Sequence, residues 1–133
     1  MNGNIIYPVA EQIIEYNVIA LEVLRVKKAD TPKVLSHQKI AEVINNCRQT
    51  EGDIYDKAVA LLIGLVRKHP FASGNRRTAF IATKDFLLNN RVTFGIKDDP
   101  YYARVMLGIR ENFYSEEEIK EWICHGKIRE FRR

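Results

Sequence analysis

The fold is decided by the apolar segment Ile54-Tyr-Asp-Lys-Ala-Val-Ala-Leu-Leu-Ile-Gly-Leu-Val-Arg-Lys68 and by the segment after it, His69-Pro-Phe-Ala-Ser-Gly-Asn-Arg-Arg-Thr78. A helix that is apolar on nearly all sides belongs in the centre of a domain. Pro70 ends this helix, because the residue before a proline avoids the right-handed helical region. The sequence therefore predicts a buried helix over 54–68 and a short loop directly after it.

A second helix is predicted to follow this loop, over about Asn75–Asn89. Two helices joined by so short a loop pack side by side and antiparallel. The loop then lies at the end of the most buried helix, where it is rigidly supported and partly exposed. Loops held in this way are favoured places for binding and catalysis.

Further helices are predicted on both sides of this pair, which makes the chain all-α. Their expected positions are 8–28, a helix capped by Ser36 that ends near the turn at 50–53, a helix capped by Asp98 or Asp99 with Pro100 in its first turn, and a last helix opened by Ser115. Asp53 is the expected N-cap of the helix over 54–68. Residues 91–96 are expected to form a short strand or an extended segment. No linker or repeat divides the chain, so residues 1–133 are predicted to form a single compact helical bundle.

Composition limits the classes of function. The chain has 46% hydrophobic and 29% charged residues, which is ordinary for a globular protein. A net charge of +4 is too small to favour a nucleic-acid binder. No apolar run reaches membrane-spanning length, and no leader peptide is evident at the N-terminus, so we expect a cytoplasmic protein. Cys47 and Cys124 are expected to be reduced and packed in helices.

The loop after the buried helix combines groups suited to phosphate chemistry. His69 could take a proton from a hydroxyl at neutral pH, although a histidine in a turn is more often held by local backbone bonds. Gly74 indicates a positive φ or a close approach by a ligand. The amide of Asn75 could cap the helix, meet a phosphate or hold the loop. Arg76 and Arg77 oppose the dipole at a helix N-terminus, which favours a bound anion.

At these residues the chain resembles the Fic/Doc family, whose signature is His-x-Phe-x-Asp/Glu-Gly/Ala-Asn-Gly/Lys-Arg. The buried helix before the motif and its continuation Thr78-Ala-Phe80 look most like the Doc (death-on-curing) branch. The resemblance implies a bundle of helices, with His69 as the general base on a target hydroxyl. It also implies an anion hole at Gly74 and Asn75, phosphate binding by Arg77, and a short β-flap around residues 27–35 that holds the target.

Three departures from the family pattern bear on the chemistry. Ser73 stands where most members carry the acid that holds Mg²⁺, and a neutral hydroxyl is a poor ligand for that ion. Arg76 stands where AMP-transferring members have glycine and Doc has lysine, so a long side chain crowds the position of an α-phosphate. Phe80 replaces a second arginine of the AMP-transferring members. Arg76 and Phe80 favour transfer of a γ-phosphate, with Arg76 as a further phosphate-binding residue.

The expected function is therefore that of a Doc-like toxin, which moves a phosphate from ATP or another nucleoside triphosphate to a Ser or Thr hydroxyl of a target protein, such as a translation factor. An antitoxin protein would be its partner, and the oligomeric state stays open. Two alternatives remain: transfer of AMP, and a Fic-type binding module that has lost catalysis. Cys47-Arg-Gln-Thr-Glu-Gly52 partly matches an inhibitory motif of Fic proteins, but its cysteine replaces the required hydroxyl residue.

Overall fold

The computed structural model describes residues 4–23 and 31–132. These residues form helices α1 Ala10–Val23, α2 His37–Gln49, α3 Ile54–Lys68, α4 Asn75–Asn89, α5 Tyr101–Arg110 and α6 Glu116–His125. They contain no sheet, only one isolated antiparallel bridge between Val34 and Phe71. The prediction of an all-α fold is confirmed.

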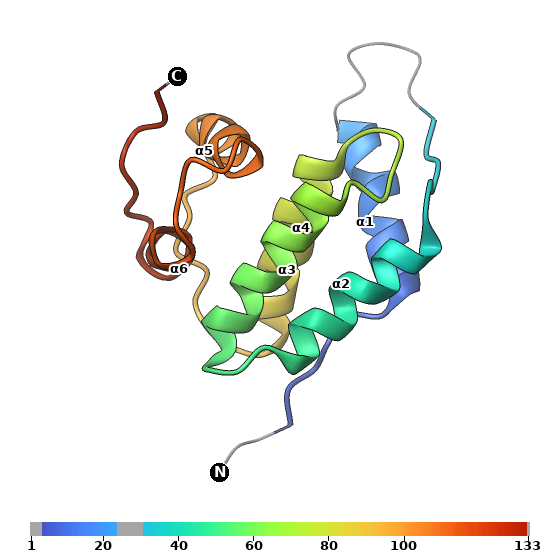
Figure 1. The fold of residues 1–133 in the computed structure, drawn as a ribbon, viewed down its shortest axis with the longest axis horizontal. Coiled ribbons are helices and arrows are strands. Elements are labelled where there is room, and N and C mark those ends of the chain that lie inside the picture. Colours follow the sequence, from blue (N-terminus) through green and yellow to red (C-terminus); the bar gives the residue numbers. More distant parts are fainter. Residues whose placement is uncertain (1–3, 24–30, 133) are drawn as a thin grey trace.

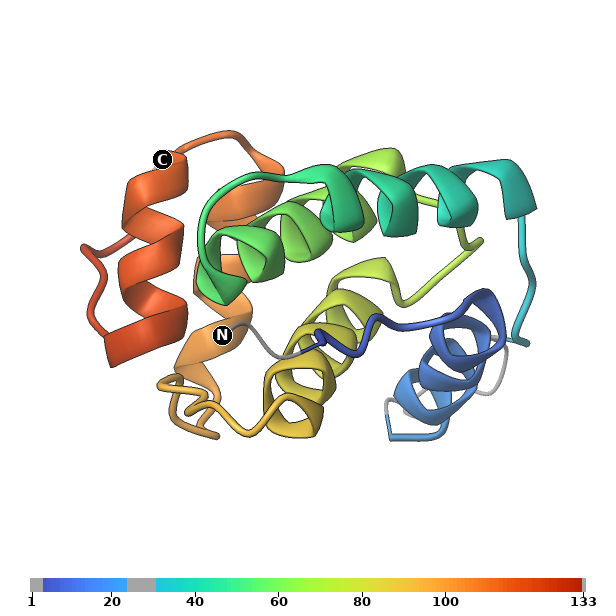
Figure 2. The same cartoon turned by 90° about the horizontal axis from the view of Figure 1, so that it is seen from below.

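The helices α3 and α4 lie side by side and antiparallel at the centre of the molecule (Figure 1). The helix α2 packs on α3, and α1 packs on α4, so the two pairs form two layers when the molecule is seen from below (Figure 2). The helices α5 and α6 pack against α3 on the other side. The chain thus surrounds α3 with its neighbours, and Leu61, Leu62 and Leu65 are almost fully buried.

The capping residues predicted from the sequence are found at the starts of their helices. Ser36 and Ser115 accept hydrogen bonds from the backbone of their own helices, and Ser115 forms a capping box with Glu118. Asp53 caps α3 in the same way. At the start of α5 the Asp99 carboxylate accepts a hydrogen bond from the Tyr101 N–H at 2.9 Å, which is the bond expected of a capping side chain. Pro100, with its helical φ of −61°, follows it in the first turn, as predicted.

Two other predicted boundaries shift. The first helix begins at Ala10 rather than Pro8, and the part of the prediction beyond Val23, residues 24–28, lies outside the described residues. Residues 91–96 form no strand: Arg91 lies in a turn with φ 63°, and 92–96 are irregular. The Gly95 N–H donates to the Ile123 carbonyl at 2.7 Å, which ties this segment to α6. Within the described part of the chain, none of the helices has both the length and the apolar content needed to cross a membrane.

Candidate active site

The loop between α3 and α4 begins with a residue in an unusual conformation. His69 adopts φ 56° and ψ 56°, the left-handed region, at the C-cap of α3. Residues other than glycine adopt this region uncommonly, although asparagine, aspartate and histidine do so more often than the rest. The turn ends α3 one residue before Pro70 and leaves the imidazole exposed at the end of the most buried helix. The backbone thus places the His69 side chain at the surface, at the start of the loop.

The buried amide of Asn75 holds the loop closed. Its Oδ1 accepts a hydrogen bond from the Phe71 N–H at 3.0 Å, and its Nδ2 donates to the Phe71 carbonyl at 2.8 Å. Gly74, with φ 77°, is the N-cap of α4, so Asn75 is not the cap. Of the roles that the sequence left open, the structure supports that of holding the loop.

A second buried asparagine, Asn17 of α1, supports the other half of the loop. Its Nδ2 donates to the Ser73 carbonyl at 2.9 Å and to Thr78 Oγ1 at 3.1 Å. Gly74 packs closely against the same helix, because a Cβ atom there would lie 3.0 Å from Leu21 Cδ2. The positive φ predicted for Gly74 is confirmed. Together these contacts fix the backbone from Phe71 to Thr78 on α1 and α4.

The outer edge of the loop is paired with the chain before α2. Pro70 O accepts hydrogen bonds from the Leu35 and Ser36 N–H groups, and the Ala72 N–H donates to Lys33 O at 3.0 Å. These bonds surround the Val34–Phe71 bridge. The C-terminal part of the expected flap over 27–35 therefore contacts the loop. Residues 27–30 of that prediction lie outside the described residues.

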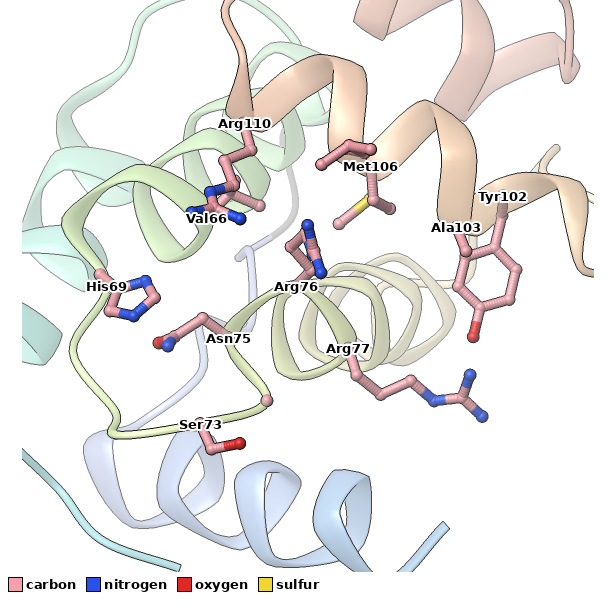
Figure 3. Close-up of a pocket in the computed structure, with 12 residues that line it drawn as sticks. Val66, His69, Ser73, Asn75, Arg76, Arg77, Tyr102, Ala103, Met106 and Arg110 are labelled. Atoms are coloured by element: carbon pink, nitrogen blue, oxygen red, sulfur yellow. The ribbon is translucent and has the colours of Figure 1, made fainter. Parts of the chain in front are cut away.

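A pocket of about 410 Å³ opens beside the loop. One side consists of the predicted site residues His69, Ser73, Gly74, Asn75, Arg76 and Arg77, which the structure brings together. The opposite side is the helix α5, with Tyr102, Met106 and Arg110 (Figure 3). The predicted residues thus share one cavity, and α5 closes it.

The two adjacent arginines point in different directions. Arg76 extends toward Met106 and Arg110 on α5, whereas Arg77 extends away from His69 toward Tyr102 (Figure 3). The Arg77 guanidinium carbon lies 5.5 Å from the centre of the Tyr102 ring. Consecutive residues on a helix point about 100° apart, so one of the pair faces α5 and the other faces the rim.

The Arg76 guanidinium lies in a positively charged environment. Partial burial and, secondly, the charge of Arg110 lower the pKa of Arg76 from its usual range. Neither arginine forms an ion pair with a carboxylate among the described residues. An anion in the pocket would relieve this repulsion.

Comparison with known families agrees with this geometry. The model of the Fic/DOC family matches residues 21–87, which contain α2, α3, the whole loop and most of α4, together with the end of α1. This chain belongs to the Fic/Doc family. No curated protein matches the chain. Membership of this family suggests an enzyme that transfers a group from a nucleoside triphosphate, and α5 and α6 lie outside the matched residues.

The family's Mg²⁺ ion does not fit the donors that this Fic/Doc chain offers. No Asp or Glu is among the described residues that line the pocket, and Ser73 supplies only a hydroxyl. The described part of the chain also contains no cluster of His, Cys, Asp and Glu suited to a metal. Mg²⁺ prefers carboxylate oxygens, while the pocket carries three arginines. The structure therefore offers no protein carboxylate to hold the ion in the pocket.

The glutamate of the partial inhibitory motif lies far from this Fic/Doc pocket. Glu51 and Gly52 form the turn before α3, whereas His69 follows its last residue. The 15 residues of α3 span about 22 Å. Gly52 packs against Asp56 at the first turn of α3. The position supports the interpretation of this segment as a helix end followed by a turn.

Sequence reasoning missed the wall formed by α5. Tyr102, Met106 and Arg110 line the pocket at spacings of four residues, which is the spacing of one helix face. The helix itself was predicted, and this spacing could have marked the face. The sequence did not indicate that this face of α5 would pack over the loop.

Proposed function

We propose that this Fic/Doc protein is a Doc-like phosphotransferase, which moves the γ-phosphate of a nucleoside triphosphate to a Ser or Thr hydroxyl of a target protein. The observation that carries the proposal is the position of Arg76. Its long side chain extends into the pocket where AMP-transferring members have glycine (Figure 3). The space beside the loop is therefore reduced for an α-phosphate, and a guanidinium is available for the terminal phosphates.

In the proposed reaction His69 is the general base. Its imidazole takes the proton of the target hydroxyl as the hydroxyl oxygen forms a bond to the γ-phosphorus. The bond from that phosphorus to the β-phosphate oxygen breaks, and a nucleoside diphosphate leaves. Backbone N–H groups at the start of α4 and the nearby arginines would stabilise the negative charge. Asn75 acts in this scheme by keeping the loop in place.

The biological setting that we propose is a toxin–antitoxin pair. The target would present its hydroxyl in an extended segment beside residues 31–35, a β-augmentation mode that the Val34–Phe71 bridge begins. A translation factor is the proposed target, and an antitoxin encoded beside this chain is the proposed partner. ATP is the proposed donor.

Two other functions make different predictions. In AMP transfer the target hydroxyl would attack the α-phosphorus and pyrophosphate would leave. The Arg76 side chain opposes this reaction because it reduces the space for an α-phosphate. A binding module without catalysis is favoured by the missing carboxylate at Ser73. All three are separated by incubating the protein with a cell extract and ATP that is radiolabelled at either the α or the γ position.

We expect protein-bound label only from γ-labelled ATP. His69→Ala should reduce this labelling by about 10²- to 10⁴-fold, because the general base is lost. His37→Ala, the same change at an exposed histidine at the start of α2, should leave it unchanged. Label from the α position would contradict phosphate transfer and support AMP transfer. A protein that binds ATP and transfers no label would support the binding module.

A further inference from the structure

One positively charged side chain of the pocket, Arg110, is not part of the family motif. Arg110 is the last residue of α5 and lies outside the residues that the family model matches. It lines the same pocket as His69, Arg76 and Arg77, and no carboxylate does so among the described residues. The positive charge of the pocket thus comes from two separate parts of the fold, the loop and α5.

The side chains of Arg76 and Arg110 both reach into the pocket (Figure 3), close enough for the charge of Arg110 to act on Arg76. Two guanidinium groups so placed repel each other, and neither forms an ion pair with a carboxylate among the described residues. Two arginines on an open surface could move apart in water and so avoid this repulsion. Guanidinium groups that face a shared space are suited to bridging oxygens of one polyphosphate, since each can bind two oxygens at once.

The remaining wall of the pocket is apolar. Val66, Met106 and Leu107 lie on the α3 and α5 sides, and Tyr102 closes the far end. A volume of about 410 Å³ lies in the range of small-molecule sites, which is about 300–1,000 Å³. A ligand with a charged part and a flat apolar part, such as a nucleotide, matches both surfaces.

We propose that Arg76 and Arg110 form a clamp that binds the β- and γ-phosphates of a nucleoside triphosphate without a divalent metal ion. The two guanidinium groups supply the positive charge that a carboxylate-held Mg²⁺ ion would otherwise supply. This inference rests on the proposed function for the identity of the ligand. Arg110 thereby becomes a binding residue of this chain that the motif does not contain.

The test is calorimetric titration of the full chain with ATP, AMP and inorganic tripolyphosphate, in EDTA and in excess Mg²⁺. We expect ATP and tripolyphosphate to bind in EDTA and Mg²⁺ to add little. Arg110→Gln should weaken ATP binding by about 10- to 100-fold, the loss typical of a charge-assisted contact. AMP binding should change much less, because AMP lacks the outer phosphates. Arg132→Gln removes the same charge at an exposed arginine near the C-terminus and should have no effect.

The outcomes separate this clamp from the proposed function. ATP binding that requires Mg²⁺, or that is equally strong in Arg110→Gln, overturns the clamp, while γ-label transfer would still support the phosphotransferase. Absence of any ATP or tripolyphosphate binding also overturns the clamp. Metal-independent ATP binding by a protein that transfers no label supports the clamp and contradicts the phosphotransferase. Circular dichroism of Arg110→Gln checks that the variant is folded.

Discussion

At its N-terminal end α3 is closed by a complete set of polar contacts, whereas its C-terminal end carries a strained residue and unneutralised charge. The Asp53 carboxylate accepts hydrogen bonds from the Tyr55 and Asp56 N–H groups, and the Asp56 carboxylate accepts one from the Asp53 N–H. Lys120 of α6 lies 3.0 Å from the Asp56 carboxylate. At the other end, His69 is left-handed, and Arg76 and Arg110 reach into the pocket beside it.

The difference separates groups that stabilise the fold from groups that await a ligand. At the first end, the charged groups that we have named are matched by partners within the chain. At the second, the loop backbone is equally well satisfied through Asn75 and Asn17. The guanidinium groups of Arg76 and Arg110 have no ion-pair partner among the described residues. The loop is therefore a rigid support that presents unsatisfied cations, which is the arrangement expected of a preorganised anion site.

The largest expected effect comes from removing the support. Asn75→Ala leaves the N–H and the carbonyl of Phe71 without their partner in a buried environment. Unsatisfied buried groups each cost about 1–3 kcal/mol, so for these two groups the free energy of unfolding should fall by about 2–6 kcal/mol. Urea denaturation followed by circular dichroism measures it.

Asn89→Ala is the matched control for this variant. Asn89 is exposed at the other end of α4, and its change should stay within about 0.5 kcal/mol. If Asn75→Ala is no more destabilising than Asn89→Ala, the amide does not hold the loop. The contrast between a supported loop and its unsatisfied cations would then be wrong.

A smaller effect of opposite sign is expected at His69. Glycine enters the left-handed region without a steric penalty, so His69→Gly should raise the free energy of unfolding by about 1 kcal/mol while it removes the proposed base. His69→Ala loses the same imidazole but keeps a Cβ atom, so its stability should stay near that of the wild type. Equal stabilities for the glycine and alanine variants would show that the backbone at His69 is not strained.

The sequence was sufficient to predict the hairpin of α3 and α4 because its signals are local. Asp53 precedes a continuous apolar run, and Pro70 follows its end, so both limits of α3 could be deduced from neighbouring residues. The motif from His69 to Arg77 could likewise be identified without any long-range contact. Its residues line one pocket because a six-residue loop leaves them little freedom.

The sequence was not sufficient where the outcome depends on packing between distant segments. The position of Arg110 depends on how α5 packs over α3, through contacts more than 40 residues apart, such as that of Arg67 with Ile109 O. Helix geometry alone predicts that Arg76 and Arg77 point in different directions. Which of the two faces α5 depends on how α4 and α5 pack together. From the sequence the Asn75 amide could cap the helix, meet a phosphate or hold the loop. Only the position of the Phe71 backbone, which bonds to this amide, distinguishes these roles.

The smallest expected effect tests the stabilised end of α3. The pKa of the Asp56 carboxyl lies below its ordinary 3.8, first because of its hydrogen bond with Lys120 and second because of the Asp53 N–H. A lowered pKa in the folded state means that the ionised carboxylate adds stability above the unfolded pKa and loses it as the pH falls through the folded one. In Asp56→Asn the acceptor for the Asp53 N–H is kept and the charge is lost.

The wild type should therefore be more stable than Asp56→Asn at pH 7, and the difference should disappear as the pH falls below 3.8, measured by urea denaturation. Glu117→Gln, at an exposed carboxylate in the first turn of α6, shows what the loss of a surface charge alone does. If the two variants follow the same pH profile, Asp56 adds nothing specific, and the N-terminal end of α3 is less stabilised than its contacts indicate.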